Sequence, residues 1–307
     1  MKYEALREEL KKSDADQIST TDKDVRSMPI NHNRIEVSYN AQTVVDSKNC
    51  LIVHYENTNV HDKKALARLA IETKNILQKE SIEVRADKGY HNAEQIQACS
   101  DNNIVTYVPA AEPARFTDVP APDYYGEKFR YDQSADVYIC PKGNAMTTNG
   151  SWYDKKYKNT VTKLKQYKTK ACRSCPVKHL CTSNPKGRII DRKQYAQAVE
   201  ANAARVLLHK EKYLLRQQIV EHPFGTIKRQ WGFDYLLMKE LKKNEAEFGL
   251  IFSVYNLRRI LSILGIPELI KRLGNAFLFL FMLTRSVTRH FITFFFRSYR
   301  HSISLVS

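Results

Sequence analysis

The interpretation of this sequence begins with two short stretches, ADKGY at residues 86–90 and VEHPFG at residues 220–225. Asp87 follows an alternating apolar run that predicts a strand, and Glu221 closes a long helical pattern before a Pro-Phe-Gly that should break the helix. Both are positions at which a fold can hold a carboxylate in place. Two carboxylates can bind Mg²⁺, which prefers oxygen ligands and can activate a nucleophile in phosphodiester chemistry.

The pattern around the first stretch is typical of an α/β fold. Two strands are predicted at residues 39–46 and 51–55, and a helix follows at 62–79. A strand at 83–86, a helix at 92–102 and a strand at 104–108 come next. The order predicts a mixed sheet covered by helices. Further along the chain, residues 194–220 and 239–264 have strong helical patterns, and residues 129–191 contain short aromatic-rich strands and four cysteines.

The charge of the chain is unevenly spread. The formal net charge is +16 over 307 residues, and the excess is concentrated in residues 155–243, whereas residues 1–154 are net acidic. A dense cationic segment favours phosphate-bearing partners through counterion release and steering. The alternative is a solvated basic face kept for solubility.

Neither end of the chain predicts export or membrane insertion. Residues 1–12 are charged and have no apolar core, so no signal peptide is expected and the protein should be cytoplasmic. The apolar runs at residues 276–283 and 291–296 are too short and too interrupted by arginine to span a bilayer, and no membrane partner is expected.

The cysteine spacing predicts a zinc site. Cys172 and Cys175 form a CxxC pair, and Cys140 and Cys181 could complete a tetrahedral set of thiolates. Disulfides are not expected in a cytoplasmic chain, so the alternative is four reduced cysteines in a loosely packed insertion. Cys50 and Cys99 lie outside this group and are interpreted as core thiols. His179 could replace one ligand, although a surface histidine is the simpler interpretation.

Taken together, these motifs carry a resemblance to a known family. ADKGY, the Cys-Pro-x-Gly at Cys140, the CxxCP run and VEHPFGTIKR at residues 220–229 resemble the DDE transposases of bacterial insertion sequences, in the subgroup with a cysteine-bearing insertion. The likeness runs from about Thr21 to Leu273. It implies an RNase H-like fold and Mg²⁺- or Mn²⁺-dependent cleavage and joining of DNA strands at transposon ends.

The resemblance also implies roles for individual residues. Asp87 matches the second catalytic acid and Glu221 the third, so both are expected to bind the metal. Tyr213, Arg216, Glu221 and Lys228 approximate the Tyr-Arg-Glu-Lys signature of the family, although Arg216 stands one residue too far from Glu221. Lys228 and Arg229 are expected to hold DNA phosphates. The competing interpretations are a turn acid for Asp87, a surface helix residue for Glu221 and solvated charge for the basic residues.

One family element has no match in this sequence. The first catalytic aspartate of the family stands on an opening strand well upstream of a Thr-Asp-x-Asp-x-Arg segment, which is Thr21–Arg26 here. The expectation is therefore an N-terminally truncated copy that is inactive by itself. Asp46 is the only local substitute considered, and a turn role suits it better. Asp22 and Asp24 are interpreted as linker residues.

The predicted fold class is α/β, an RNase H-like mixed sheet with flanking helices interrupted by a cysteine-rich, zinc-type insertion. Five divisions are predicted. They are a polar linker at residues 1–30, the first part of the catalytic domain at 31–123, the insertion at 124–192, a helical completion of the catalytic domain at 193–273 and a basic aromatic tail at 274–307. DNA is the expected partner, and a homodimer is possible because transposition joins two DNA ends. The alternatives are a zinc-stabilised DNA-binding remnant without catalysis, and a cysteine-rich RNA-processing nuclease, which accounts less well for the EHPFG run.

Overall fold

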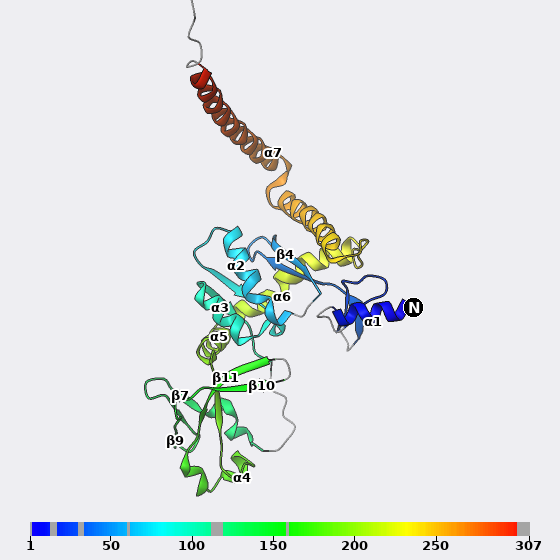
Figure 1. The fold of residues 1–307 in the computed structure, drawn as a ribbon. Helices are drawn as coiled ribbons and strands as arrows, with labels where there is room; N and C mark the ends of the chain where they lie inside the picture. The colour runs from blue at the N-terminus through cyan, green and yellow to red at the C-terminus, as the bar shows by residue number, and fades with distance from the viewer. Residues whose placement is uncertain are drawn as a thin grey trace, which may run out of the picture. The chain divides into compact units, whose positions relative to one another are not determined.

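The structure, a computed structural model, describes residues 2–12, 17–29, 34–59, 62–111, 119–157 and 160–299 (Figure 1). The chain divides into two compact units. One consists of Met1–Val60 together with Gln217–Ser307, and the other of His61–Arg216. The second unit is thus an insertion in the sequence of the first.

The first half of the unit His61–Arg216 is a small α/β assembly. Its elements are η2 (Asp62–Lys64), α2 (Leu66–Ile76), β5 (Ile82–Arg85), η3 (Lys88–Tyr90), α3 (Ala93–Asp101) and β6 (Ile104–Tyr107). Strands β5 and β6 pair in parallel, with Ile82 opposite Ile104, and α3 makes the crossover between them. Asn92 begins α3 with its side chain, which accepts hydrogen bonds from the amides of Glu94 and Gln95.

A compact apolar core holds this assembly together. Leu66, Ala70, Ile96, Cys99 and Val108 are among its buried members, contributed by α2, α3 and the end of β6. The predicted interpretation of Cys99 as a core thiol is confirmed, since its side chain is fully buried. Helix α5 (Ala196–Leu208) packs on α3 and β6 and closes the core.

Asn202 of α5 fixes that helix to the end of β6. Its Oδ1 accepts from the amide of Val108 at 3.0 Å, and its Nδ2 donates to the carbonyl oxygen of Val108 at 2.7 Å. Asn202 is 1% exposed and Val108 is completely buried. Since buried backbone groups need partners, the side-chain amide provides the pair of hydrogen bonds that a further strand would otherwise make.

The second half of this unit contains the predicted insertion. Its elements are η4 (Pro122–Tyr124), η5 (Gly126–Lys128), β7 (Arg130–Asp132), β8 (Val137–Ile139), β9 (Ala145–Met146), β10 (Tyr153–Tyr157), β11 (Thr160–Tyr167), η6 (Lys170–Arg173), α4 (Lys178–Cys181) and β12 (Ile190–Lys193). They form two antiparallel sheets, β7-β8-β9 and β10-β11-β12. The core is largely aromatic, with Phe129, Tyr138 and Tyr167 buried beside Met146 and Ile190. Aromatic side chains therefore supply the packing area that the aliphatic residues do not.

The unit that contains both ends of the chain is organised around one hairpin and one long helix. Its elements are α1 (Lys2–Lys12), β1 (Arg26–Pro29), β2 (Ile35–Ser38), β3 (Asn40–Val45), β4 (Ile52–Thr58), the π-helical η7 (Gly225–Gln230) and α7 (Leu241–Tyr299), while α6 (Lys210–Phe224) begins in the other unit. Helix α7 packs on β4, and Gly249 makes the close approach possible, because a Cβ there would lie 2.5 Å from the hydroxyl oxygen of Tyr55.

Asn256 of α7 anchors this unit in the same way as Asn202 anchors the other. Its Oδ1 accepts from the amide of Ile52, and its Nδ2 donates to the carbonyl oxygen of Ile52, each at 2.8 Å. Ile52, Phe252 and Tyr255 are buried in the adjoining core. These two hydrogen bonds therefore fix α7 against the first residue of β4.

The mixed α/β architecture and most of the predicted elements are confirmed. The hairpin around residue 48 and the strands and helices near residues 62–108 are present, with bounds shifted by a few residues. The single predicted sheet is not found among the described residues, in which β3-β4 and β5-β6 are separate two-stranded sheets.

Other predictions need adjustment. The helix predicted at residues 194–220 is two helices, α5 and α6, which meet at His209, where the backbone leaves the helical region. The segment 1–30, predicted as a polar linker, contains α1 and β1. The basic aromatic tail from residue 274 continues α7 as far as Tyr299, after a non-helical residue at Gly265, and residues 300–307 lie outside the described part of the chain.

Membrane insertion was not expected from the sequence, although part of α7 has an apolar composition. Residues Leu241–Gly274 are long and apolar enough to cross a bilayer by length and composition. The same test is passed by helices of soluble proteins, so it is weak evidence. Asn256, Arg259 and Tyr255 on this helix make hydrogen bonds to the β3-β4 hairpin, which ties this part of α7 to the folded unit.

The two hydrogen bonds between Asn202 and the backbone of Val108, here called the Asn202 clamp, lead to a prediction about stability. We expect Asn202→Ala to lower the free energy of unfolding by about 2–4 kcal/mol, because the amide and the carbonyl of Val108 would both be buried without partners. Urea unfolding followed by circular dichroism measures the change. Asn75→Ala, the same replacement at an exposed position of α2, is the control and should cost less than about 1 kcal/mol. Equal losses in the two variants would contradict the role of the clamp.

Candidate metal and nucleic-acid site

Asp87 stands at the exposed end of β5, two residues after the strand. It begins the short helix η3, and its Oδ1 accepts a hydrogen bond from the amide of Lys88 at 2.7 Å. The turn-acid interpretation therefore has a geometric basis. The same side chain is exposed, so its second oxygen can still accept another ligand. Capping and metal binding are compatible at this position.

A second carboxylate lies near Asp87 within the same unit. Asp62 begins η2, and a Cβ at Gly89 would lie 3.6 Å from Asp62 Oδ2. The pKa of Tyr90 is raised, first by burial and then by the negative charges of Asp62 and Asp87. Asp62 was absent from the predicted site because it reads as the first residue of a helix. Asp62 lies near Asp87 because η2 contacts η3, and no sequence motif predicts that contact.

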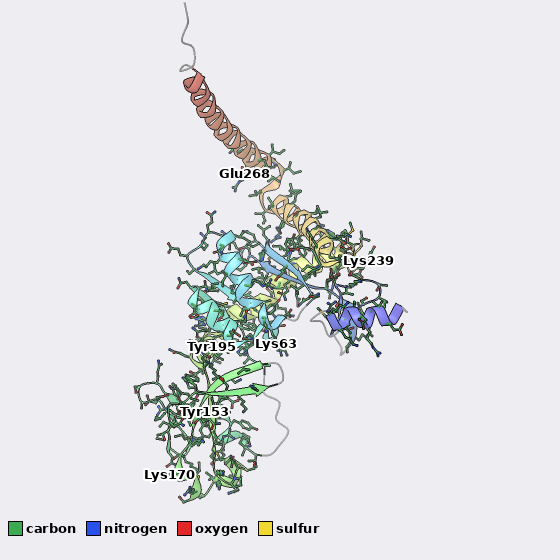
Figure 2. The ribbon with its side chains drawn as sticks, viewed as in Figure 1. Lys63, Tyr153, Lys170, Tyr195, Lys239 and Glu268 are labelled. Atoms are coloured by element: carbon green, nitrogen blue, oxygen red, sulfur yellow. The ribbon has the colours of Figure 1, made fainter. Side chains whose placement is uncertain are left out.

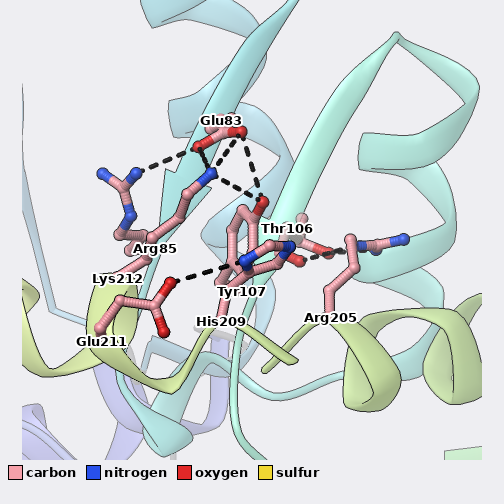
Figure 3. A network of polar contacts seen from close by, with 8 residues as sticks. All are labelled: Glu83, Arg85, Thr106, Tyr107, Arg205, His209, Glu211 and Lys212. Carbon is pink, nitrogen blue, oxygen red and sulfur yellow. Dashed lines mark hydrogen bonds and ion pairs between the residues drawn. The ribbon is translucent and has the colours of Figure 1, made fainter. Parts of the chain in front are cut away.

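A polar network fixes β5 and β6 to the beginning of α6 (Figure 3). Lys212 Nζ donates to both oxygens of Glu83 at 3.1 and 3.2 Å, and Tyr107 Oη donates to Glu83 Oε1 at 3.3 Å. Arg85 also pairs with Glu83 at 3.0 Å. Burial raises the pKa of Glu83, but the hydrogen bond and charge of Lys212 and the charge of Arg85 outweigh it and lower the pKa. Two basic residues are therefore engaged by protein rather than available to a ligand.

Glu221 lies on the exposed side of α6. Gln217 Nε2 donates to Glu221 Oε1 at 2.9 Å, one turn earlier on the same helix. The prediction that Pro-Phe-Gly breaks this helix is wrong. Pro223 is inside α6, and the chain continues from Gly225 as a π-helix to Gln230. Proline removes one backbone donor to the preceding turn, yet α6 continues through it, and the π-helical segment begins only afterwards.

The predicted DNA-binding residues occupy the same helical segment. The guanidinium of Arg216 lies 5.4 Å from the ring centroid of Tyr213, and its Nε is buried without a hydrogen-bond partner in the described structure. The ammonium of Lys228 lies 5.6 Å from the ring centroid of Phe224. Arg229 is exposed, as is Lys228. Tyr213 and Arg216 belong to the unit His61–Arg216, whereas Lys228 and Arg229 belong to the other.

Asp46, the weakest predicted catalytic residue, closes the turn between β3 and β4. Its carboxylate accepts from the amide of Asn49 at 2.6 Å and from that of Lys48 at 3.3 Å. Its backbone amide and carbonyl also bond across the turn, to Leu51 and Cys50. The turn interpretation accounts for all of these contacts.

Asp22 and Asp24, interpreted as linker residues, have a structural role at the start of α7. Asp22 Oδ2 accepts from the hydroxyl of Tyr39 at 2.7 Å and from the amide of Glu240 at 2.9 Å. Asp24 Oδ2 accepts from the amide of Leu241 at 2.9 Å. Carboxylates at a helix N-terminus satisfy amides that have no partner within the helix. The sequence could not reveal this role because the partners are more than 200 residues away.

The four cysteines of the insertion line one cavity of about 30 Å³. Cys140 lies at the end of β8, Cys172 on η6, Cys175 just after it and Cys181 at the end of α4. Burial raises the pKa of Cys181, and the other three cysteines raise it further, in opposition to Arg188. Figure 2 labels Lys170 at the start of η6 in this part of the insertion.

Gly187 packs directly against this cluster. Its φ is +98°, and a Cβ there would lie 2.6 Å from the Cβ of Cys172. Only glycine fits such a position without displacing the cysteine. Among the residues that the structure describes, however, no group of three or more His, Cys, Asp or Glu side chains is arranged to hold a metal ion. The cysteines are gathered in one place but their sulfur atoms are not in a ligating arrangement.

The structure thus brings the predicted zinc ligands to one cavity, and it places the two predicted catalytic acids in different units. Asp87 belongs to His61–Arg216, and Glu221 to the unit that resumes at Gln217. Each acid is exposed, and each has one carboxylate oxygen engaged by a nearby donor.

Comparisons with known proteins give one match. No curated protein and no solved structure matches the chain. Residues 139–261 match the family model described as a transposase DDE domain. The matched segment includes the four cysteines of the insertion, Tyr213, Arg216, Glu221, Lys228 and Arg229, but it does not extend to Asp87. This similarity supports a DDE transposase.

Proposed function

We propose that the protein is a DDE-type DNA transposase that cleaves and joins DNA strands with the help of divalent metal ions. The similarity of residues 139–261 to a transposase DDE domain is the observation that carries the proposal. It covers Glu221 and the basic residues that follow it, together with the cysteine motifs of the resemblance, but not ADKGY at residues 86–90. The cytoplasmic location and the homodimer remain predictions.

Asp87 and Glu221 are proposed as metal-binding carboxylates. Both are exposed acids with one oxygen engaged and further lone pairs available, which suits Mg²⁺ or Mn²⁺, ions that prefer oxygen ligands and retain water. Divalent metal would supply charge stabilisation and an activated oxygen nucleophile for phosphodiester chemistry. Asp46 is not favoured, because its carboxylate is occupied by two amides of its own turn.

The basic residues are proposed to position DNA. Lys228 and Arg229 are exposed on η7, within two turns of Glu221, and are suited to charge-assisted contacts with phosphate oxygens. Arg216 and Tyr213 form a stacked pair on α6. The net charge of +16 supports a polyanionic partner.

Zinc is proposed for the cysteine-lined cavity. Two observations support it: four thiols line one small cavity, and Gly187, where a Cβ would lie 2.6 Å from the Cβ of Cys172, lets the chain pack against them. The described arrangement is not a ligating one, so tetrahedral coordination would require the cysteine side chains to move. A metal bound there would compensate thiolates that otherwise repel one another.

The alternative function is a zinc-stabilised protein that binds DNA without cleaving it. It is favoured by the same cysteine cavity, together with the lack of a described group of three or more metal-ligating side chains near either acid. The inactivity expected from the sequence was expected of the transposase itself, and Mg²⁺-dependent cleavage by the purified protein would overturn that expectation.

An assay with DNA separates the two functions. Purified protein is incubated with labelled duplex DNA from the regions that flank its gene, with Mg²⁺ or with EDTA. The transposase proposal predicts Mg²⁺-dependent nicking or joining that is reduced at least 100-fold in Asp87→Asn and in Glu221→Gln. DNA binding without cleavage under any condition would contradict catalysis by this chain, and would agree with both the expected inactivity and the alternative.

Metal binding by the two acids can be measured without catalysis. We expect Asp87→Asn and Glu221→Gln each to weaken Mn²⁺ binding at least tenfold, because each removes a charged oxygen ligand; paramagnetic enhancement of water relaxation measures the affinity. Asp101→Asn on α3 and Glu211→Gln on α6 are matched controls at exposed positions and should bind Mn²⁺ as the wild type does. Unchanged affinity in the Asp87 and Glu221 variants would remove both acids from the proposed site.

The zinc proposal has its own test. Purified protein should contain about one zinc ion per chain by elemental analysis, and Cys175→Ser should lose the metal and unfold at lower temperature, because metal binding is coupled to folding. Cys50→Ser, outside the cluster, is the control. A metal-free protein whose thermal unfolding is changed equally by the two replacements would show that the cysteines are structural thiols.

A further inference from the structure

A polar pocket lies beside the segment that contains Glu221, and none of the predicted site residues lines it. Its volume is about 170 Å³, well above the roughly 10–15 Å³ that one water molecule needs. It is lined by His222, Thr226, Gln230, Tyr255, Arg258, Arg259 and Ser262. All of these residues belong to the unit that resumes at Gln217.

The pocket is built from two helical rows. His222, Thr226 and Gln230 recur every four residues along the end of α6 and η7, so they share one side of that segment. Arg258 and Arg259, together with Ser262, occupy one side of α7. Two residues of the first row, Thr226 and Gln230, lie on the π-helical η7. Such turns recur at functional sites.

Arg258 and Arg259 are held in place by contacts that leave their positive charges available to bind an anion. Arg259 Nε donates to the carbonyl oxygen of Asn49 at 2.7 Å, so the two terminal nitrogens of its guanidinium are not needed for that bond. The guanidinium of Arg258 lies 5.7 Å from the ring centroid of Trp231. No acidic side chain is among the described residues that line the pocket. The site is therefore a concentration of positive charge without an internal counterion.

His222 is oriented by a chain of hydrogen bonds. The hydroxyl of Tyr255 donates to the carbonyl oxygen of Cys50 at 2.7 Å, and burial raises the pKa of Tyr255 to about 12, so the phenol keeps its proton. His222 Nδ1 lies 2.8 Å from the same hydroxyl oxygen and must be the donor to it. With Nδ1 as the donor, Nε2 of the neutral ring carries a lone pair and can only accept a hydrogen bond.

We propose that this pocket binds a phosphate group of the DNA backbone, with Arg258 and Arg259 as the charged donors and Thr226 and Gln230 as neutral ones. Guanidinium groups match the geometry of phosphate oxygens and remain charged at any physiological pH. The choice of DNA as the source of the phosphate rests on the proposed function. Because His222 directly follows Glu221, a phosphate held here would fix the DNA backbone next to the segment that contains that acid.

The phosphate site is tested first with inorganic phosphate. Trp152→Phe leaves Trp231 as the single tryptophan, beside Arg258, and its fluorescence reports on the pocket. We expect saturable binding of inorganic phosphate that Arg258→Gln weakens about tenfold, since it removes a charge-assisted donor. Arg272→Gln makes the same charge change on α7 outside the pocket and should have no effect. Equal phosphate affinity in the two arginine variants would overturn the proposal.

The source of the phosphate is tested with duplex DNA in EDTA, so that the result does not depend on the proposed carboxylate metal site. The slope of log affinity against log salt should fall by about one in Arg258→Gln and stay unchanged in Arg272→Gln. If phosphate binding falls while the salt slope does not, the pocket takes a free phosphate and the DNA assignment is wrong. If phosphate and DNA bind as expected but Mn²⁺ binding does not depend on Asp87 or Glu221, the proposed function fails and this inference stands.

Discussion

The attachment of α7 to the first residue of β4 is the interaction on which the unit containing Glu221 depends. The side-chain amide of Asn256 satisfies both backbone groups of Ile52, in a position where they would otherwise be buried without partners. Tyr255 and Arg259, its neighbours on α7, bond to the carbonyl oxygens of Cys50 and Asn49 on the same turn. Three successive contacts therefore join a helix to a hairpin that is about 200 residues away in the sequence.

This attachment has consequences for chemistry. Tyr255 also accepts the hydrogen bond of His222, which places the end of α6 relative to α7. The exposed Glu221 and the basic residues of η7 follow from that placement, as does the pocket lined by Arg258 and Arg259. The same device, an asparagine that pairs with a strand backbone, recurs at Asn202 and Val108 in the other unit. In each unit a helix is thus attached to the backbone of one residue at, or directly after, the end of a strand.

Local patterns in the sequence predicted the parts of the fold that depend on local physics. Alternation and helical spacing located the hairpin, β5, β6 and the main helices, and the CxxC spacing correctly brought attention to four cysteines that line one cavity. The predicted break at Pro223 was wrong because the helix continues through the proline, and the change to π-helical pitch comes after it, from Gly225 to Gln230.

Long-range contacts could not be predicted from one sequence. Nothing local distinguishes Asn202 or Asn256 from a surface asparagine, and the role of Asp22 and Asp24 at the start of α7 depends on amides more than 200 residues away. The proximity of Asp62 to Asp87, and the pocket formed by His222 and the two arginines, likewise arise only when separate elements pack. The two proposed metal-binding acids, Asp87 and Glu221, were chosen by motif, and metal binding by each of them is the central claim.

Iron-mediated cleavage of the polypeptide tests that claim most directly. Fe²⁺ substituted for Mg²⁺ and activated with ascorbate and peroxide generates radicals that cut the backbone next to the bound ion, and mass spectrometry maps the cuts. The account predicts cuts near residue 87 and near residue 221, both suppressed by excess Mg²⁺. Cuts near only one of these positions, or cuts that Mg²⁺ does not suppress, would contradict metal binding by both acids and with it the proposed transposase chemistry.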